Sequence, residues 1–277
     1  MSYKTIVVHL DAGARRGERL GLGCELAARC DAHLIGLFAL EDMRVPYAFG
    51  GTAGALLLME ERWRKEVAAE AKREFETVSA RNGVKAEWRG STRNAVAALA
   101  LNARYADLLI IGQHERGASG DERLPGYFVQ ETVLTAGRPV LVVPYVGRYP
   151  TIGGRVLIAW NASREAARAV TDALPLLQAA KAVEVVAFDP LQAGADHGEQ
   201  PGADIALYLA RHGVKATAAR QDARIDAGAQ LLSYASDFGA DLIVMGAYGH
   251  SRVRELVLGG ATRTVLESMT VPVLMAH

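Results

Sequence analysis

Short, continuously apolar runs alternate along the chain with longer stretches of helical character. Runs such as 6–8 and 242–245 contain no alternating polar residues, which is typical of strands buried on both faces of a parallel sheet. The pattern predicts strands near 5–10, 33–39, 84–89, 107–111, 139–143, 155–160, 182–188, 214–220, 241–245 and 272–276. It predicts helices near 16–30, 57–82, 92–104, 127–136, 163–180, 201–212, 226–238 and 261–268.

The two halves of the chain repeat each other in the same order. Residues 5–13 resemble 155–163, residues 105–112 resemble 239–246, and residues 138–144 resemble 271–277. The first pair is offset by 150 residues and the second by 134, so the first half has about 16 extra residues, which we expect between 41 and 61. Alternating strands and helices imply right-handed crossovers and doubly wound α/β sheets.

We therefore predict an α/β protein made of two tandem doubly wound, five-stranded parallel-sheet domains. The predicted domains are 1–148 and 153–277. The segment 146–154, which contains Gly147, Pro150, Gly153 and Gly154, is the expected linker.

Composition excludes several classes of protein. The 277 residues include 31 Lys and Arg and 31 Asp and Glu, so the net charge is zero. A nucleic-acid binder or a polybasic membrane-surface protein would have a basic surplus. No apolar run approaches the roughly 20 residues that span a bilayer, and no signal peptide is visible. We expect a cytoplasmic protein, with the two cysteines, Cys24 and Cys30, reduced and mostly buried.

A glycine pattern follows the strand near 241–245. Its spacing is G-x2-G-x9-G-G-x-T, from Gly246 and Gly249 to Gly259, Gly260 and Thr262. Glycine lets a backbone turn tightly and approach a ligand without a Cβ in the way. The helix expected to start near Ala261 would offer free N–H groups to an anion.

This spacing resembles the nucleotide loop of the universal stress protein family. The resemblance extends over the whole chain as two tandem copies, as in two-domain bacterial members. It implies an adenine nucleotide, ATP, ADP or AMP. Mg²⁺ would arrive only with such a nucleotide, bound mainly through phosphate oxygens. Adenine and ribose would lie near Ala159, Trp160, Asn161, Ala187 and Met245. Ribose and phosphates would lie on Gly246, Gly249, Gly259, Gly260, Ala261 and Thr262.

Two positions depart from the nucleotide-binding members of that family. Asn161 stands where they usually have Asp, and Gly260 stands where they usually have Ser or Thr. Trp160 either stacks on a base or fills the end of the sheet. His250, Arg252 and Arg254 either reach phosphates or are simply solvated.

The first half departs further from the pattern. Glu115 replaces the second glycine after Gly112, and no Gly-Gly pair opens the helix near Tyr127, although Asp11 keeps the family's acidic residue. We expect this half to bind no nucleotide in the same way and to act as a structural partner. His114 and Glu115 are a weak candidate for an acid/base pair.

No catalytic or metal-binding motif is recognisable, so we expect at most slow ATP hydrolysis. The leading hypothesis is a stress-response regulator that binds an adenine nucleotide in its second half. The alternatives are a nucleotide-free module for protein partners or another small ligand, and an enzyme of the wider adenine-nucleotide α-hydrolase group. A homodimer and an unidentified protein partner are both compatible with the sequence.

Overall fold

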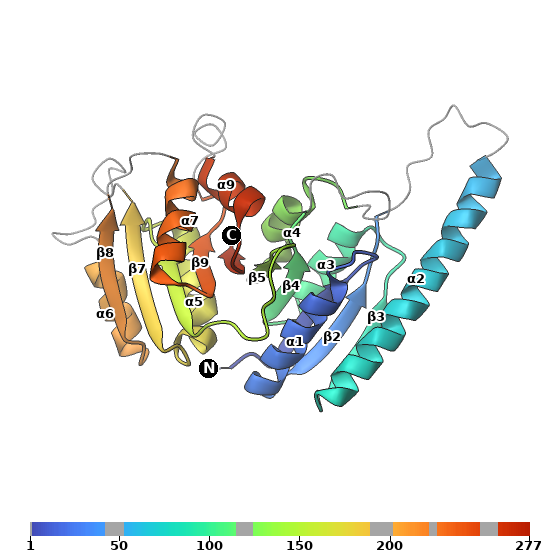
Figure 1. Ribbon diagram of the computed structural model, residues 1–277, viewed down its shortest axis with the longest axis horizontal. Helices are drawn as coiled ribbons and strands as arrows, with labels where there is room; N and C mark the ends of the chain where they lie inside the picture. The colour runs from blue at the N-terminus through green and yellow to red at the C-terminus, as the bar shows by residue number, and fades with distance from the viewer. Residues whose placement is uncertain (1, 42–52, 115–123, 189–201, 222–225, 250–259) are drawn as a thin grey trace.

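The computed structural model describes residues 2–41, 53–114, 124–188, 202–221, 226–249 and 260–277. Within these ranges, ten strands form one sheet in the order β3-β2-β1-β4-β5-β10-β9-β6-β7-β8 (Figure 1). The strands are β1 (Thr5–Leu10), β2 (His33–Phe38), β3 (Ala86–Gly90), β4 (Leu108–Gly112), β5 (Val140–Val143), β6 (Arg155–Ala159), β7 (Ala182–Phe188), β8 (Ala216–Gln221), β9 (Leu242–Gly246) and β10 (Val273–Ala276).

Helices cover both faces of this sheet, as the expected crossovers require. On one face lie α1 (Arg16–Cys30), α2 (Ala53–Arg81), α5 (Arg164–Leu177) and α6 (Ala203–Arg211), packed over one apolar core. On the other lie α3 (Ala95–Ala103), α4 (Phe128–Ala136), α7 (Ala227–Phe238) and α9 (Gly260–Ser268), packed over a second core. The predicted α/β class and the five strands of each half are confirmed.

The two halves join through their last strands. Strand β10 runs antiparallel to β5, with Val273 opposite Val142 and Met275 opposite Val140, while the other neighbouring strands run parallel. Polar contacts add to the junction: the Gln113 side chain donates to the Leu266 carbonyl at 2.8 Å, and the Tyr149 hydroxyl donates to the Thr270 carbonyl at 2.7 Å. The pairing of final strands thus takes place within one chain.

Two aspartates hold the first strand of each half by its backbone. Oδ2 of Asp107 accepts hydrogen bonds from the N–H groups of Lys4 and Thr5. In the second half, Asp241 accepts from Gly153, Gly154 and Arg155 at 2.9–3.0 Å. Each carboxylate therefore fixes the start of the strand beside its own.

Helix α2 accounts for much of the difference in length between the halves. It has 29 residues, whereas α6, which occupies the corresponding place in the second half, has nine. The insertion expected between 41 and 61 lies partly outside the described residues, and its described part extends the start of α2. Figure 1 shows this end of α2 projecting beyond the sheet, and Leu57, Leu58 and Met59 are exposed on it.

Candidate functional site

The carboxyl ends of four strands of the second half meet at one edge of the sheet. Ala159 pairs with Met245, and Gly246 pairs with Ala276. The N–H of Trp160 donates to the Val186 carbonyl at 2.9 Å, which sets Trp160 beside the end of β7 and next to Ala187. The sheet thus brings together Ala159, Trp160, Ala187, Met245 and Gly246.

The residues at these strand ends differ in how deeply they are buried. Ala187 and Met245 are buried, while Ala159 and Trp160 are partly exposed. The Trp160 ring packs against the apolar core on the α5 face. Core packing, one of the two roles expected for Trp160, is therefore observed.

The turn after β6 is stabilised by its own side chains. Oδ1 of the exposed Asn161 accepts from the N–H of Ser163 at 3.2 Å, and Ala162 has a positive φ of 55°. Oγ of Ser163 accepts from the N–H of Ala166 at 3.1 Å and so caps α5. Serine is a favoured residue for this position because its oxygen satisfies a helix N–H that has no other partner.

Gly246 is required because the protein packs tightly on itself. A Cβ at Gly246 would lie 2.5 Å from the backbone nitrogen of Ala166 and 2.7 Å from the carbonyl carbon of Glu165. Because backbone atoms cannot easily move away, the end of β9 can lie this close to the start of α5 only if residue 246 is glycine. At Gly249, a Cβ would collide with the Glu165 carboxylate and lie 3.3 Å from Oγ of Ser163.

The last helix supplies the other part of the predicted site. Helix α9 begins at Gly260, with Ala261 and Thr262 half-buried in its first turn. Gly228 lets α7 approach it, because a Cβ there would lie 2.6 Å from the Ala261 carbonyl oxygen. Gly259, His250, Arg252 and Arg254 lie outside the described residues.

Two carboxylates beside these glycines were missed by the sequence prediction. Glu165, in the first turn of α5, is only 2% exposed and lies against Gly249. Asp226 caps α7, with Oδ1 accepting from the N–H of Ala229 at 2.9 Å, and its other oxygen lies against Gly260. The sequence signals were modest: an acid two residues after the Ser163 cap, and an aspartate directly before a helix.

The charge state of Glu165 follows from opposing effects. Burial raises the pKa of the Glu165 carboxyl, but the hydrogen bond from Arg164, a hydrogen bond to the Glu165 backbone and the electrostatic effects of Arg164 and His277 together lower it, so the pKa lies below its usual range. Arg164 Nε donates to Oε1 of Glu165 at 2.6 Å. Glu165 is therefore a buried anion at neutral pH.

In the first half, a buried ion pair lies beside the corresponding strand end. Nη2 of Arg19 donates to Oδ1 of Asp11 at 2.6 Å, and both residues are buried. A Cβ at Gly112 would lie 2.6 Å from Nη1 of Arg19. Asp11, the acidic residue that the resemblance singled out, is thus already paired with a cation of its own chain.

A buried aromatic residue begins helix α4 of the first half. Phe128, the first residue of α4, is fully buried, and its ring centroid lies 5.3 Å from that of His9. His9 is also fully buried, with Nε2 2.9 Å from the Ala39 carbonyl oxygen. Of the candidate acid/base pair of His114 and Glu115, Glu115 lies outside the described residues, so the pair stays a prediction.

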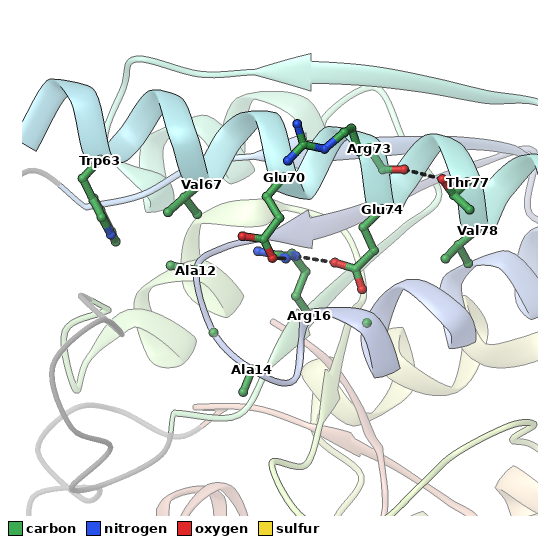
Figure 2. Close-up of a pocket in the computed structure, with 12 residues that line it drawn as sticks. Ala12, Ala14, Arg16, Trp63, Val67, Glu70, Arg73, Glu74, Thr77 and Val78 are labelled. Atoms are coloured by element: carbon green, nitrogen blue, oxygen red, sulfur yellow. Dashed lines mark hydrogen bonds and ion pairs between the residues drawn. The ribbon is translucent and has the colours of Figure 1, made fainter.

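A groove of about 720 Å³ lies elsewhere, between the β1–α1 turn and α2. Figure 2 shows Glu70 and Glu74 of α2 reaching toward Arg16, with Trp63 and Val67 further along the wall. Arg16 donates to Glu74 at 2.7 Å, to Glu70 at 3.1 Å and to the Asp11 carbonyl at 2.8 Å. The guanidinium of Arg16 is already neutralised by these two glutamates, so it is not available to bind an anion in the groove.

The described part of the chain has neither a cluster of metal ligands nor a membrane-spanning helix. No group of three or more His, Cys, Asp or Glu residues there could hold a metal ion. Every helix there falls short of the length or apolar character needed to cross a bilayer. Cys24 is buried and Cys30 is half-buried, and both are free thiols.

Comparisons with known proteins agree with the fold. The model of the universal stress protein family matches residues 2–144 and 154–277. The crystal structure of a universal stress protein from Archaeoglobus fulgidus DSM 4304 aligns over 98% of this chain and 95% of its own, with 17% identity and a TM-score of 0.71.

Two further relatives match smaller parts of the chain. Universal stress protein Slr1230 of Synechocystis is 48% identical over 44 residues, which are 16% of this chain and only 15% of that relative. A universal stress protein crystallised in complex with cAMP covers 52% of this chain and 98% of its own, with 24% identity and a TM-score of 0.36.

Proposed function

The chain belongs to the universal stress protein family, and from that premise we propose that its second half binds an adenine nucleotide and its first half does not. Nucleotide binding is a property of some members of this family, one of which was crystallised with cAMP. On this proposal, the bound nucleotide biases the conformation of the protein or its contacts with a partner.

One contrast between the halves carries the proposal. The first turn of α9 offers Gly260, Ala261 and Thr262, whereas the first turn of α4 begins with the buried Phe128. The N–H groups at the start of a helix and its dipole attract a phosphate. Small residues begin α9 in the second half. In the first half, the large side chain of Phe128 begins α4 and packs beside His9 in the apolar core, and Arg19 lies against Gly112 at the end of β4.

The remaining residues suit the other parts of a nucleotide. Ala159, Ala187 and Met245 are apolar residues at the strand ends, where open parallel sheets bind ligands. Asn161 would donate or accept one hydrogen bond with the ribose, although its Oδ1 already accepts from Ser163. A divalent cation, when bound with the nucleotide, would offset phosphate charge, and Thr262 would contribute its hydroxyl to a phosphate oxygen.

A second candidate function is favoured by the carboxylates. Glu165 and Asp226 lie against Gly249 and Gly260, where they would repel an uncompensated polyphosphate. In that case the same loops would serve as a nucleotide-free surface for a protein partner or for another small ligand.

Thermal unfolding with and without ATP and Mg²⁺ separates the two functions. A ligand that binds only the native state raises the melting temperature by mass action. We expect a rise with wild type and none with Thr262→Asp, because an aspartate in the first turn favours the helix yet repels phosphate. Gln130→Asp adds the same charge to the exposed face of α4 and should leave the rise unchanged.

Mass spectrometry of the denatured, freshly purified protein provides an independent test. Carried-over ATP, ADP or AMP would support the proposal. Absence of any nucleotide, together with no rise in melting temperature at millimolar ATP and Mg²⁺, would overturn it in favour of the nucleotide-free function.

A further inference from the structure

Glu165 is a buried carboxylate that is only half satisfied. Its Oε1 accepts from Arg164, but within the described ranges its Oε2 has no hydrogen-bond partner. The side chain is 2% exposed. Burying a charged oxygen without a partner costs free energy, so such groups in native proteins need a specific reason.

The unpaired side of this carboxylate is directed at the glycine turn. A Cβ at Gly249 would collide with Oε2 and would lie 3.0 Å from the Glu165 carboxyl carbon. The absence of a side chain at Gly249 therefore lets the carboxylate approach the main chain of the turn. The proposed function assigns the ribose and phosphates to the same turn, so a nucleotide bound there would lie close to Oε2.

This placement makes the charge of the ligand important. A free polyphosphate beside Glu165 would place like charges together in a partly dry site, where repulsion is stronger than in water. A divalent cation between the Glu165 carboxylate and the polyphosphate would be bound by both groups. Mg²⁺ is usually held by one or two carboxylates plus phosphate oxygens rather than by a cage of protein groups.

The rest of the described chain is consistent with a shared cation. No group of three or more metal-ligating side chains is found there, so a cation would be held jointly by protein and nucleotide. Asp226, whose second oxygen lies against Gly260, adds a further acceptor near the start of α9.

We propose that Glu165 makes the second-half site selective for the divalent-cation complex of a nucleotide, with Oε2 as the protein's ligand to that cation. This inference rests on the proposed function and adds a determinant to it. Glu165 excludes the free polyanion, and the cation converts the same carboxylate into a contact.

Calorimetric titration of the full chain with ATP, in Mg²⁺ and in EDTA, tests this role. Wild type should bind ATP at least about tenfold more weakly in EDTA, an energy of about 1.4 kcal/mol. Glu165→Gln keeps the shape but removes the charge, so its affinities in Mg²⁺ and EDTA should become nearly equal. Glu165→Ala provides a second neutral variant if the glutamine variant fails to fold.

Glu131→Gln is the matched control. Glu131 is also an acid in the first turn of a helix, α4, but it is exposed and belongs to the first half. Its substitution should leave the dependence on Mg²⁺ as in wild type.

The outcomes are distinct. If wild type binds free ATP as tightly as its Mg²⁺ complex, or if the neutral variants keep the full dependence, Glu165 serves only the structure of α5 and the inference is wrong while the proposed function stands. If no protein binds ATP under either condition, the proposed function itself fails.

Discussion

Gly112 and Gly246 end corresponding strands of the two halves, yet different neighbours require each glycine. Gly246 lies against the backbone at the start of α5, whereas Gly112 lies against the guanidinium of Arg19. The same residue thus permits a close backbone approach in one half and a buried ion pair in the other. A glycine pattern alone does not distinguish these uses, because its contacts come from a helix start far away in the sequence.

For the same reason the site was only partly predictable. The repeat predicted strands that end near Ala159 and Gly246, and the sheet places these strand ends side by side. Glu165 lies about 80 residues before the glycine turn and was assigned no role. Its contact with Gly249 depends on how α5 docks on β9, which no local pattern encodes.

His9 gives the fold a measurable dependence on pH. Burial lowers the pKa of His9 from its ordinary value, so the folded state keeps it neutral at a pH where the unfolded chain is already protonated. Stability is therefore lost as pH falls below about 6.5 toward the pKa of the folded state. Compared with wild type, His9→Gln should lose less stability between pH 7.5 and 5.5, by on the order of 1 kcal/mol.

Urea unfolding at these two pH values provides the measurement. Equal losses in wild type and in His9→Gln would show that His9 does not titrate differently in the folded and unfolded states.

At the scale of elements, the presence of each strand and helix was easier to predict than the residues at which it begins and ends. Both copies of the repeat show the same apolar runs, so each strand and helix was expected twice. Helix α2 was expected near 57–82 and spans Ala53–Arg81, so only its first four residues were missed. Helix α5 continues for two residues beyond Pro175 and ends at Leu177, three residues before the expected end.

Substitution of Asp241 tests whether its carboxylate stabilises the start of β6, the first strand of the second half. Asp241→Ala removes the acceptor of three backbone N–H groups at the start of β6. Leaving such donors without a partner should lower the free energy of unfolding by about 1–3 kcal/mol. The control Asp237→Ala, on an exposed position of α7, should stay within about 0.5 kcal/mol of wild type. A loss for Asp241→Ala no larger than for the control would rule out this role.

At the scale of the whole molecule, the pairing of β5 with β10 makes two Rossmann-like domains into one ten-stranded sheet. Each of the two apolar cores contains residues from both halves. The sheet edge that each half would otherwise expose at its last strand is covered by the other half.

We therefore expect cooperative unfolding of the entire chain. Calorimetry should give a single transition whose calorimetric and van't Hoff enthalpies agree. Two separate transitions would mean that the halves unfold independently despite their shared sheet.

The difference between the halves is the central claim, and its most direct test is the stoichiometry of nucleotide binding. Isothermal titration of the full chain with ATP in Mg²⁺ should give one nucleotide per chain. Two per chain would contradict the proposal that the first half, with its Arg19–Asp11 ion pair and buried Phe128, binds no nucleotide. None at millimolar ATP would contradict the assignment of the second half.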